Sequence, residues 1–321
     1  QGGGMEIKMY IGIDLGGTFI KAGIVAEDGT IIHKDSAPAG AGRESSLIIA
    51  DIAALIKKVL KDSGTDIKNV KSIGIGNPGT CDTENGIVVC AANLGLYNVN
   101  MRDELQKYFD LPVFVGNDAN CAALGEYAML DEDISDMVFI TLGTGVGGGI
   151  IIDKKLYTGK NGSAAEVGHM IIEQGGILCN CGARGCWEKY ASVTALIEQT
   201  KEYAKNHPES AVAKACEDGV NGKTAFVLAK QGDKGGKEIV DKWISYIATG
   251  ILSIINLLQP ELILIGGAIS REGDYLLNPI RAIQSGNTYS KIENKTRIMQ
   301  ASLGNDAGLI GSAFLGKGEI R

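Results

Sequence analysis

The chain of 321 residues carries 31 Lys and Arg against 38 Asp and Glu, a formal net charge of −7. A chain of this length exceeds the size at which one hydrophobic core keeps growing, so we expect two domains. The acidic balance disfavours nucleic acid as a partner, and no apolar run reaches the roughly 18 residues of a membrane span. No signal-peptide pattern opens the chain, so we expect a cytoplasmic protein, and we interpret residues 1–4 as a cloning remnant.

The first predicted element is a hairpin within residues 9–25, whose two apolar strands flank Gly16 and Gly17. Residues 137–153 repeat this design. Two such units indicate a duplicated architecture in which each glycine turn can lie against a phosphate, although a plain β-turn is the alternative for either one.

Between the hairpins, strands and helices alternate, which favours an α/β fold. Apolar residues at helical spacing predict a helix over 48–60, and a short helix around 105–109 stops before Pro112. The pattern also predicts three strands and one further helix, which cover 70–76, 86–92, 111–115 and 122–130 respectively.

After residue 190 the chain is predicted to be mostly helical, over 191–205, 224–230 and 237–258. An apolar strand over 261–265 then ends at Gly266 and Gly267. Open α/β sheets bind ligands at this carboxyl edge, so the glycine pair is a third place where a ligand can approach the backbone. A last helix is predicted over 306–315.

The densest chemistry lies in EVGHMIIEQGGILCNCGARGCWE, residues 166–188. Three thiolates and one imidazole match the ligand set of a structural zinc site. The residues concerned are His169, which we place at the edge of a strand, and Cys179, Cys181 and Cys186. Three free thiols in a glycine-rich turn are the alternative. A metal on one nitrogen of His169 would leave the other nitrogen free for a neighbouring protein group or for a substrate oxygen.

Two carboxylates follow predicted strands at positions suited to catalysis. Asp14 could hold hydrated Mg²⁺ against phosphates, with Thr18 as a hydroxyl donor, or it could simply form the turn. Lys21 could add charge there or be a solvated strand residue. Asp118, which follows Asn117, could be the general base for a substrate hydroxyl, or a helix N-cap.

Other polar residues beside glycine turns suit a ligand with several hydroxyls, namely Asn93, Glu166 and Glu188. Taken singly, each is more often a satisfied turn residue. The chain contains no Ser-His-Asp order, no GxxxxGK[ST] loop and no GxGxxG between a strand and a helix. These absences argue against hydrolase, P-loop and Rossmann functions.

Five motifs together resemble the ROK family of sugar kinases and repressors, and most closely its bacterial glucokinases. They are DLGGTFIK at 14–21, GNDANCAALGE at 116–126, LGTGVGGGI at 142–150, EVGHM at 166–170 and CNCGARGCWEKYAS at 179–192. The resemblance covers nearly the whole chain. Family members commonly carry Glu before the NDAN run, where this chain has Gly116.

The resemblance implies an α/β fold of the actin-like ATPase (ribonuclease H-like) type, with a cleft for sugar and ATP between two domains. We expect a small domain over 5–118, completed by a C-terminal helix over 305–321, and a large domain over 119–304 that contains the zinc loop.

The resemblance also implies a role for each matching residue. Asp118 would be the catalytic base that takes the proton of the sugar 6-hydroxyl. The sugar ligands would be Asn93, Asn117, Asp118, Glu166, His169 and Glu188. The nucleotide would be bound at Asp14, Gly16, Gly17, Thr18, Thr144, Gly145, Gly266 and Gly267. The zinc ligands would be His169, Cys179, Cys181 and Cys186.

We therefore expect an ATP-dependent and Mg²⁺-dependent kinase that converts glucose to glucose 6-phosphate, holds a structural zinc and forms a homodimer. Mannose, fructose, allose and an N-acetylhexosamine are alternative substrates. A sugar-sensing regulator without catalysis is the alternative from another class. Repressors of the family carry an N-terminal DNA-binding segment, and this chain begins almost at its first strand, so we expect no repressor.

Overall fold

The structure, a computed structural model, describes residues 8–289 and 295–317. The expected remnant at 1–4 and the last residues of the expected C-terminal helix, 318–321, lie outside this range. The chain forms two compact units, the first comprising Gln1–Met137, Gly149–Ala165 and Leu303–Arg321, and the second Val138–Gly148 and Glu166–Ser302. The expected domain boundary at residue 118 stays a prediction. No described helix is long and apolar enough to cross a membrane.

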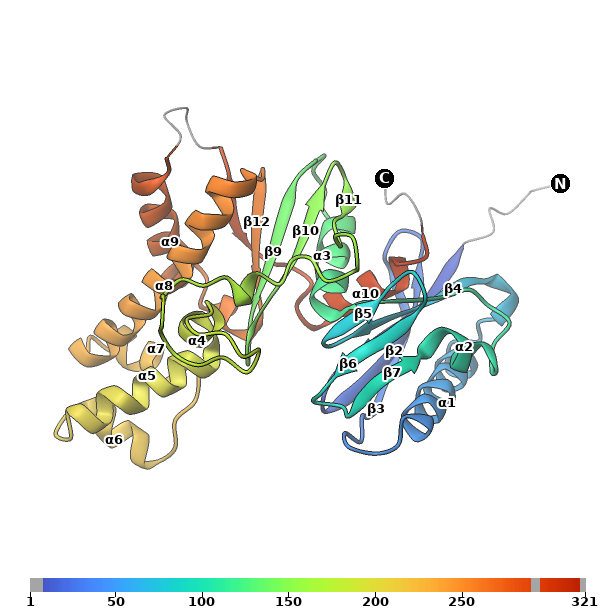
Figure 1. Cartoon of the computed structure of the whole chain (residues 1–321), viewed down its shortest axis with the longest axis horizontal. Helices are drawn as coiled ribbons and strands as arrows, with labels where there is room; N and C mark the ends of the chain where they lie inside the picture. Colours follow the sequence, from blue (N-terminus) through green and yellow to red (C-terminus); the bar gives the residue numbers. More distant parts are fainter. Residues whose placement is uncertain (1–7, 290–294, 318–321) are drawn as a thin grey trace. The chain divides into compact units, whose positions relative to one another are not determined.

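The first unit is built on a five-stranded sheet in the order β3-β2-β1-β4-β8 (Figure 1). β1 pairs antiparallel with β2, and β2 with β3, whereas β1, β4 and β8 run parallel. The strands are β1 (Met9–Leu15), β2 (Phe19–Ala26), β3 (Ile31–Pro38), β4 (Val70–Asn77) and β8 (Val113–Asn117). Strand β3 was not predicted, because its residues alternate between half-buried and exposed and its centre, His33 to Ser36, is polar.

The second five-stranded sheet has the order β11-β10-β9-β12-β13. Its strands are β9 (Met137–Leu142), β10 (Val146–Ile152), β11 (Lys155–Leu156), β12 (Leu262–Gly266) and β13 (Arg297–Gln300). The two sheets have the same strand order: β1 and β2 of the first hairpin correspond to β9 and β10 of the second, and β4 and β8 correspond to β12 and β13. The predicted duplication is therefore confirmed. A small sheet contains β5 (Thr80–Asp82), β6 (Ile87–Ala91) and β7 (Leu96–Asn100).

One face of the first sheet is lined by glycines, on which helix α10 (Ala307–Phe314) packs directly. A Cβ atom on Gly12 would lie 2.1 Å from the carbonyl oxygen of Leu309, and one on Gly74 would lie 1.8 Å from that of Ser312. Any side chain at these two glycines would therefore push α10 off the sheet.

The opposite face of this sheet is apolar and is covered by helix α1 (Ser45–Ser63). Successive strand residues point to opposite faces. The core on the α1 side includes Ile11, Ile13, Leu15, Ile48, Ile52 and Ile56. Asp14, two residues after Gly12, therefore points to the α10 face, and this alternation positions the carboxylate for the site described below.

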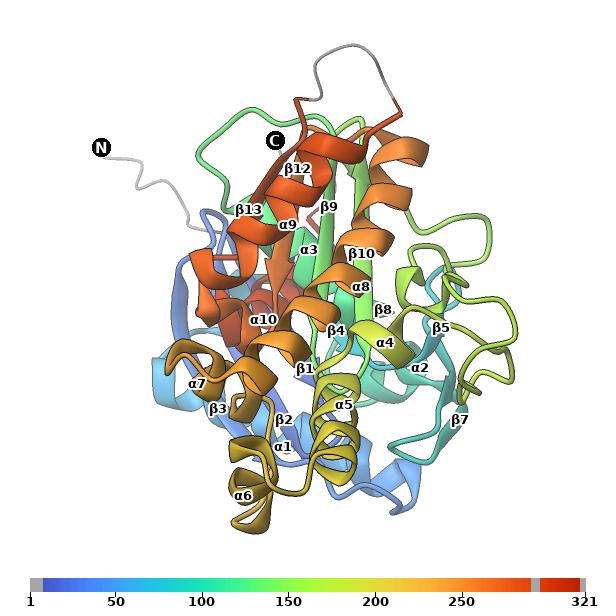
Figure 2. The same cartoon turned by 90° about the vertical axis from the view of Figure 1, so that its left-hand side faces the viewer.

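The remaining helices lie mostly in the second unit, where α8 packs against α7 and α9 and Figure 2 shows it in front of β9 and β10. They are α2 (Met101–Gln106), α3 (Asp118–Ala128), α4 (Glu188–Ala191), α5 (Val193–Asn206), α6 (Ala211–Glu217), α7 (Thr224–Lys230), α8 (Lys234–Leu258) and α9 (Asp274–Asn287). Short 3₁₀ helices cover Ile67–Asn69, Val167–His169, Ala268–Glu272 and Gly304–Asp306.

Several predicted boundaries were wrong for local reasons. Helix α3 begins four residues before the predicted start at 122, because the side chain of Asn117 caps it. The predicted helix 191–205 is interrupted at Ser192, which has an extended backbone and caps α5. His169 lies in a 3₁₀ turn and not at a strand edge. Elements α6, α9, β5, β7, β11 and β13 were not predicted.

Candidate functional site

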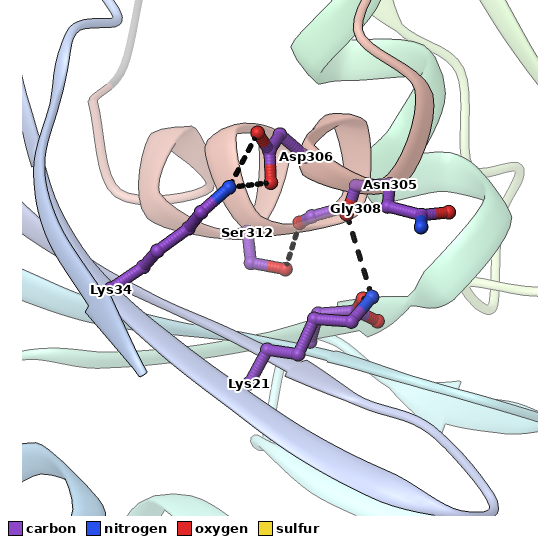
Figure 3. Close-up of polar contacts among 7 residues, drawn as sticks. Lys21, Lys34, Asn305, Asp306, Gly308 and Ser312 are labelled. Atoms are coloured by element: carbon purple, nitrogen blue, oxygen red, sulfur yellow. Dashed lines mark hydrogen bonds and ion pairs between the residues drawn. The ribbon is translucent and has the colours of Figure 1, made fainter. Parts of the chain in front are cut away.

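The first cluster of expected site residues is centred on Asp14, near the end of β1. Its Oδ2 accepts a hydrogen bond from Nζ of Lys21 at 2.7 Å, directly across the hairpin. Lys21 also donates to the carbonyl oxygen of Asn305 at 3.4 Å (Figure 3). A Cβ on Gly308 would lie 3.2 Å from Cγ of Asp14, so the start of α10 meets this carboxylate. Lys21 is thus part of the cluster and not an isolated solvated residue.

A second lysine binds the same C-terminal segment. Lys34 of β3 donates to both carboxylate oxygens of Asp306, at 2.6 and 2.7 Å (Figure 3). Both side chains of this pair are partly exposed, so it contributes about 0–1 kcal/mol. Sequence reasoning missed the contacts of Asn305 and Asp306, because no local pattern links residues so far apart in the chain.

The glycine turn of the first hairpin is open to solvent. The N–H of Gly16 donates to the carbonyl oxygen of Phe19 at 2.9 Å, which closes the turn. Gly17 and Thr18 are exposed. A Cβ on Gly17 would lie 3.4 Å from Nδ2 of Asn93, so the structure brings Asn93 to this turn. Gly17 and Thr18 are therefore accessible to a ligand from solvent.

Asn117 holds the junction between β8 and α3. Its Oδ1 accepts hydrogen bonds from the N–H groups of Ala119 and Asn120 at 2.9 and 3.1 Å, and its Nδ2 donates to the carbonyl oxygen of Gly79 at 3.1 Å. Asn117 is therefore the N-cap of α3. Its oxygen is fully used, and one N–H of its amide remains for a ligand.

Asp118 is the first residue of α3 and is half-buried. Burial raises the pKa of this carboxyl above its ordinary value of 3.8, the hydrogen bond from the Ala119 N–H opposes the shift, and the charge of Asp14 adds to it. Oδ1 of Asp118 accepts that hydrogen bond at 2.9 Å. The cap of α3 is Asn117 and not Asp118. In the part of the chain that the structure describes, only Oδ1 of Asp118 accepts a backbone hydrogen bond, so its other carboxylate oxygen can take part in chemistry.

The second cluster contains the histidine and the three cysteines. Sγ of Cys181 lies 3.6 Å from Sγ of Cys186, and Nδ1 of His169 lies 3.7 Å from Sγ of Cys179. One ligand atom from each residue can be chosen so that all four lie within 4.8 Å of one another. Ligands about 2.0–2.3 Å from zinc, at tetrahedral corners, are about 3.4–3.8 Å apart. The donor set and its spacing therefore fit zinc.

The other nitrogen of His169 faces a carboxylate. Nε2 lies 4.0 Å from Oε2 of Glu166, which comes three residues earlier. Glu166 and His169 flank the 3₁₀ turn Val167–His169. With Nδ1 toward the cysteines and Nε2 toward Glu166, the two ring nitrogens point to different partners.

Glu188 links this cluster to the second glycine hairpin. Oε1 of Glu188 accepts a hydrogen bond from Sγ of Cys179 at 3.1 Å. A Cβ on Gly145 would lie 2.6 Å from Oε2 of Glu188. Gly145 must therefore lack a side chain if the carboxylate is to keep this position. Thr144, beside it, is exposed.

Gly266 and Gly267 are explained by packing within the second unit. A Cβ on Gly266 would lie 2.7 Å from Cζ of Phe139, and one on Gly267 would lie 2.1 Å from the carbonyl oxygen of Leu142. Gly267 also has a φ of +88°, a conformation that favours glycine. The structure thus requires both glycines with or without a nucleotide, and their binding role stays a prediction.

The first unit contains Asp14, Gly16, Gly17, Thr18, Lys21, Asn93, Asn117 and Asp118. The second contains Thr144, Gly145, Glu166, His169, Cys179, Cys181, Cys186, Glu188, Gly266 and Gly267. Each unit therefore gathers its own share of the expected site.

A family model described as ROK family matches residues 10–319. The chain belongs to the ROK family. A glucokinase of Halalkalibacterium halodurans is 37% identical over 317 residues, 98% of this chain and 96% of the relative. A glucokinase of Thermotoga maritima is 36% identical over 314 residues, 97% of this chain and 98% of the relative.

A solved ROK structure is similar over nearly the whole chain. It is a ROK family glucokinase from Streptomyces griseus in complex with glucose and AMPPNP, with a TM-score of 0.81 and 35% identity, and the match covers 96% of this chain and 99% of that one. The expected mixed α/β fold of the two-domain actin-like ATPase type is thereby confirmed for this ROK chain.

Proposed function

We propose that this ROK protein is an ATP-dependent hexose kinase that phosphorylates the 6-hydroxyl of glucose. The glucokinase relatives and the complex of the Streptomyces griseus enzyme with glucose and AMPPNP support this function. The observation that carries it here is Asp118, a half-buried carboxylate with a raised pKa and one oxygen free of backbone contacts. A general base of this kind needs burial, a fixed side chain and a free lone pair.

In the proposed reaction, the free oxygen of Asp118 takes the proton of the sugar 6-hydroxyl. The sugar oxygen forms a bond to the terminal phosphorus of ATP while the bond from that phosphorus to the bridging oxygen breaks, and ADP leaves. Phosphoryl transfer depends mainly on positioning and electrostatics, so a base already fixed by the Ala119 N–H suits the step.

The other proposed sugar contacts come from polar side chains of the expected site. Asn117 can offer its one remaining amide N–H, because its oxygen caps α3. His169 presents Nε2 on the side of Glu166. Carboxylates accept from sugar hydroxyls, which is the role we propose for Glu166 and Glu188, and Asn93 would add an amide contact.

We propose that ATP phosphates bind at the two glycine hairpins. The exposed backbone and the hydroxyls of Thr18 and Thr144 would donate to phosphate oxygens, and Lys21 would add charge. Mg²⁺, when bound, neutralises charge on the transferring phosphoryl group, and Asp14 would hold its water shell. Gly16, Gly17, Gly145, Gly266 and Gly267 would line the nucleotide.

We assign zinc a structural role. His169, Cys179, Cys181 and Cys186 would hold it, and four protein ligands leave no open position for substrate. The metal then fixes the loop that places Glu166, His169 and Glu188. A homodimer and a cytoplasmic location remain predictions of the sequence.

The experiment that tests the function is an ADP-release assay with Mg²⁺-ATP over glucose, mannose, fructose, allose and N-acetylhexosamines. The proposal expects the highest kcat/KM with glucose. A higher value with another hexose changes the substrate but keeps the kinase. Sugar binding without ADP release for any hexose would instead identify a non-catalytic regulator. Replacing ATP by polyphosphate in the same assay determines the phosphate donor.

A further inference from the structure

We propose that the hydroxyl of Tyr190 positions the zinc loop by holding the backbone of Ile177. The proposal rests on the proposed zinc site and adds a residue outside the ligand set. Tyr190 lies in α4, two residues after Glu188. The N–H of Ile177 donates to the hydroxyl oxygen of Tyr190 at 2.8 Å.

Tyr190 is itself firmly held. The residue is 7% exposed. Its ring lies against that of Tyr246 in α8, with centroids 5.0 Å apart, and its carbonyl oxygen accepts a hydrogen bond from Nε2 of Gln199 at 2.9 Å. The indole N–H of Trp187 also donates to the carbonyl oxygen of Tyr246 at 2.7 Å. Helix α4 is thus fixed to α8, and the hydroxyl is presented from a rigid support.

The loop around Ile177 is held by backbone contacts and not by apolar burial. The side chains of Ile177 and Leu178 are 50% and 55% exposed. The carbonyl oxygen of Ile177 accepts from the N–H of Gly185 at 2.9 Å, so both backbone groups of Ile177 are in use. With its side chain largely in water, Ile177 depends on these two hydrogen bonds for its position.

Gly176, the residue before Ile177, has no side chain and so lets the hydroxyl of Tyr190 come close to the backbone. A Cβ on Gly176 would lie 2.0 Å from the hydroxyl oxygen of Tyr190. Only glycine is compatible with this contact at residue 176. The close approach is an observation separate from the hydrogen bond, and both point to the same hydroxyl.

Ile177 begins the hairpin that carries two of the four ligands. Leu178 forms a bridge with Arg184, and the N–H of Cys179 donates to the carbonyl oxygen of Ala183 at 2.8 Å. Cys179 and Cys181 therefore move with this hairpin, whereas His169 comes from the separate turn Val167–His169. The Tyr190 hydroxyl thus sets the position of two ligands relative to the others.

Helix α4 also carries Glu188, whose carboxylate contacts Cys179. The same short helix therefore carries both Tyr190, which holds the loop, and Glu188, the proposed sugar ligand. Loss of the Tyr190 hydroxyl should loosen the metal and shift Glu188, while Asp118, on a different element, keeps its chemistry.

The test compares Tyr190→Phe with Tyr246→Phe in the zinc-loaded protein. Tyr246→Phe also removes a hydroxyl from the same ring pair, and no hydrogen bond from that hydroxyl to the loop is found within the described residues. Zinc release to a chromophoric chelator should be about fivefold faster in Tyr190→Phe, as expected for one hydrogen bond, and unchanged in Tyr246→Phe. The KM for glucose should rise in Tyr190→Phe, with kcat within about twofold of wild type.

A second variant and a second readout keep the test decisive. Gly176→Ala should speed zinc release in the same direction, because the new methyl group displaces the hydroxyl. Hydrogen exchange of the Ile177 amide should be faster in Tyr190→Phe than in wild type, with or without metal. Wild-type rates of zinc release and amide exchange in Tyr190→Phe, or in Gly176→Ala if that variant alone folds, would overturn the proposal. If the purified wild-type protein contains no zinc, the proposed metal site is wrong. The exchange rate of the Ile177 amide in Tyr190→Phe would then still decide whether Tyr190 holds the loop.

Discussion

Oε1 of Glu188 lies 3.1 Å from Sγ of Cys179, so an expected sugar ligand and an expected metal ligand are direct neighbours. The other oxygen of the same carboxylate occupies the space where a side chain on Gly145 would begin. One carboxylate therefore joins the metal cluster to the second glycine hairpin. This arrangement makes the position of Glu188 sensitive to changes on either side.

Gly145→Ala should weaken glucose binding without unfolding the protein. The new Cβ would lie 2.6 Å from the end of the flexible Glu188 side chain, which can move at little cost in stability. Loss of a hydrogen bond to this charged group should raise the KM for glucose by about tenfold. Gly143→Ala is the matched control, since its Cβ would meet nothing within 4 Å. Equal KM values for the two variants would show that Glu188 does not contact the sugar. Steady-state kinetics and a thermal melt supply the readouts.

His169→Ala should lose metal and sugar affinity together. His169 offers Nδ1 to the cysteine cluster and Nε2 to the side of Glu166. We expect less than one zinc per chain by elemental analysis and a higher dissociation constant for glucose by calorimetry. His207→Ala changes an exposed histidine at the end of α5 and should alter neither quantity. Loss of zinc at unchanged glucose affinity would restrict His169 to the metal.

Lys21→Met should weaken the use of Mg²⁺-ATP more than Lys34→Met does. Both lysines bind the segment at Asn305 and Asp306, but only Lys21 pairs with Asp14. These partly exposed pairs contribute about 0–1 kcal/mol each, so the unfolding midpoints should stay close to wild type. Titration of Mg²⁺-ATP at saturating glucose gives the KM values. Similar KM changes in both variants would assign Lys21 to segment anchoring alone.

The pH dependence should reflect the carboxyl of Asp118. A base works when ionised, and burial raises the pKa of Asp118 above 3.8. The kcat/KM for glucose should therefore fall at a higher pH than for an ordinary aspartate as the solution is acidified. Because the pKa of Asp118 is higher in the folded than in the unfolded protein, the ionised carboxylate lowers the stability of the folded state at neutral pH. This loss of stability disappears when the pH falls below the pKa that Asp118 has in the unfolded protein. Asp118→Asn should thus unfold at the same temperature as wild type or higher.

The parts of the fold predictable from sequence were those with strong local patterns. The two glycine hairpins, the amphipathic helix α1 and the apolar strand β12 lie where the pattern placed them. Edge strand β3 and the short helix α6 were missed, because half-exposed elements carry a weak apolar signal. Gly12 and Gly74 serve the packing of α10, a role that depends on tertiary structure and that no local pattern indicated.

The candidate site was accessible from sequence only where its residues are close together in the chain. The zinc ligands span eighteen residues from His169 to Cys186, and their density alone suggested a metal. The meeting of Asp14 with Gly308, or of Tyr190 with Ile177, depends on tertiary packing, which leaves no local pattern. The role of Asn117 as the cap, which frees Asp118, was likewise undecided until both side chains could be placed.

The proposed role of Asp118 as the base of a hexose kinase is tested by the turnover of Asp118→Asn with glucose and Mg²⁺-ATP. We expect a kcat lowered by roughly 10²–10⁴-fold, with glucose affinity by calorimetry close to wild type. Asp28→Asn, the same change at an exposed aspartate of the first unit, should keep full turnover. A kcat for Asp118→Asn within a few fold of wild type would contradict the account.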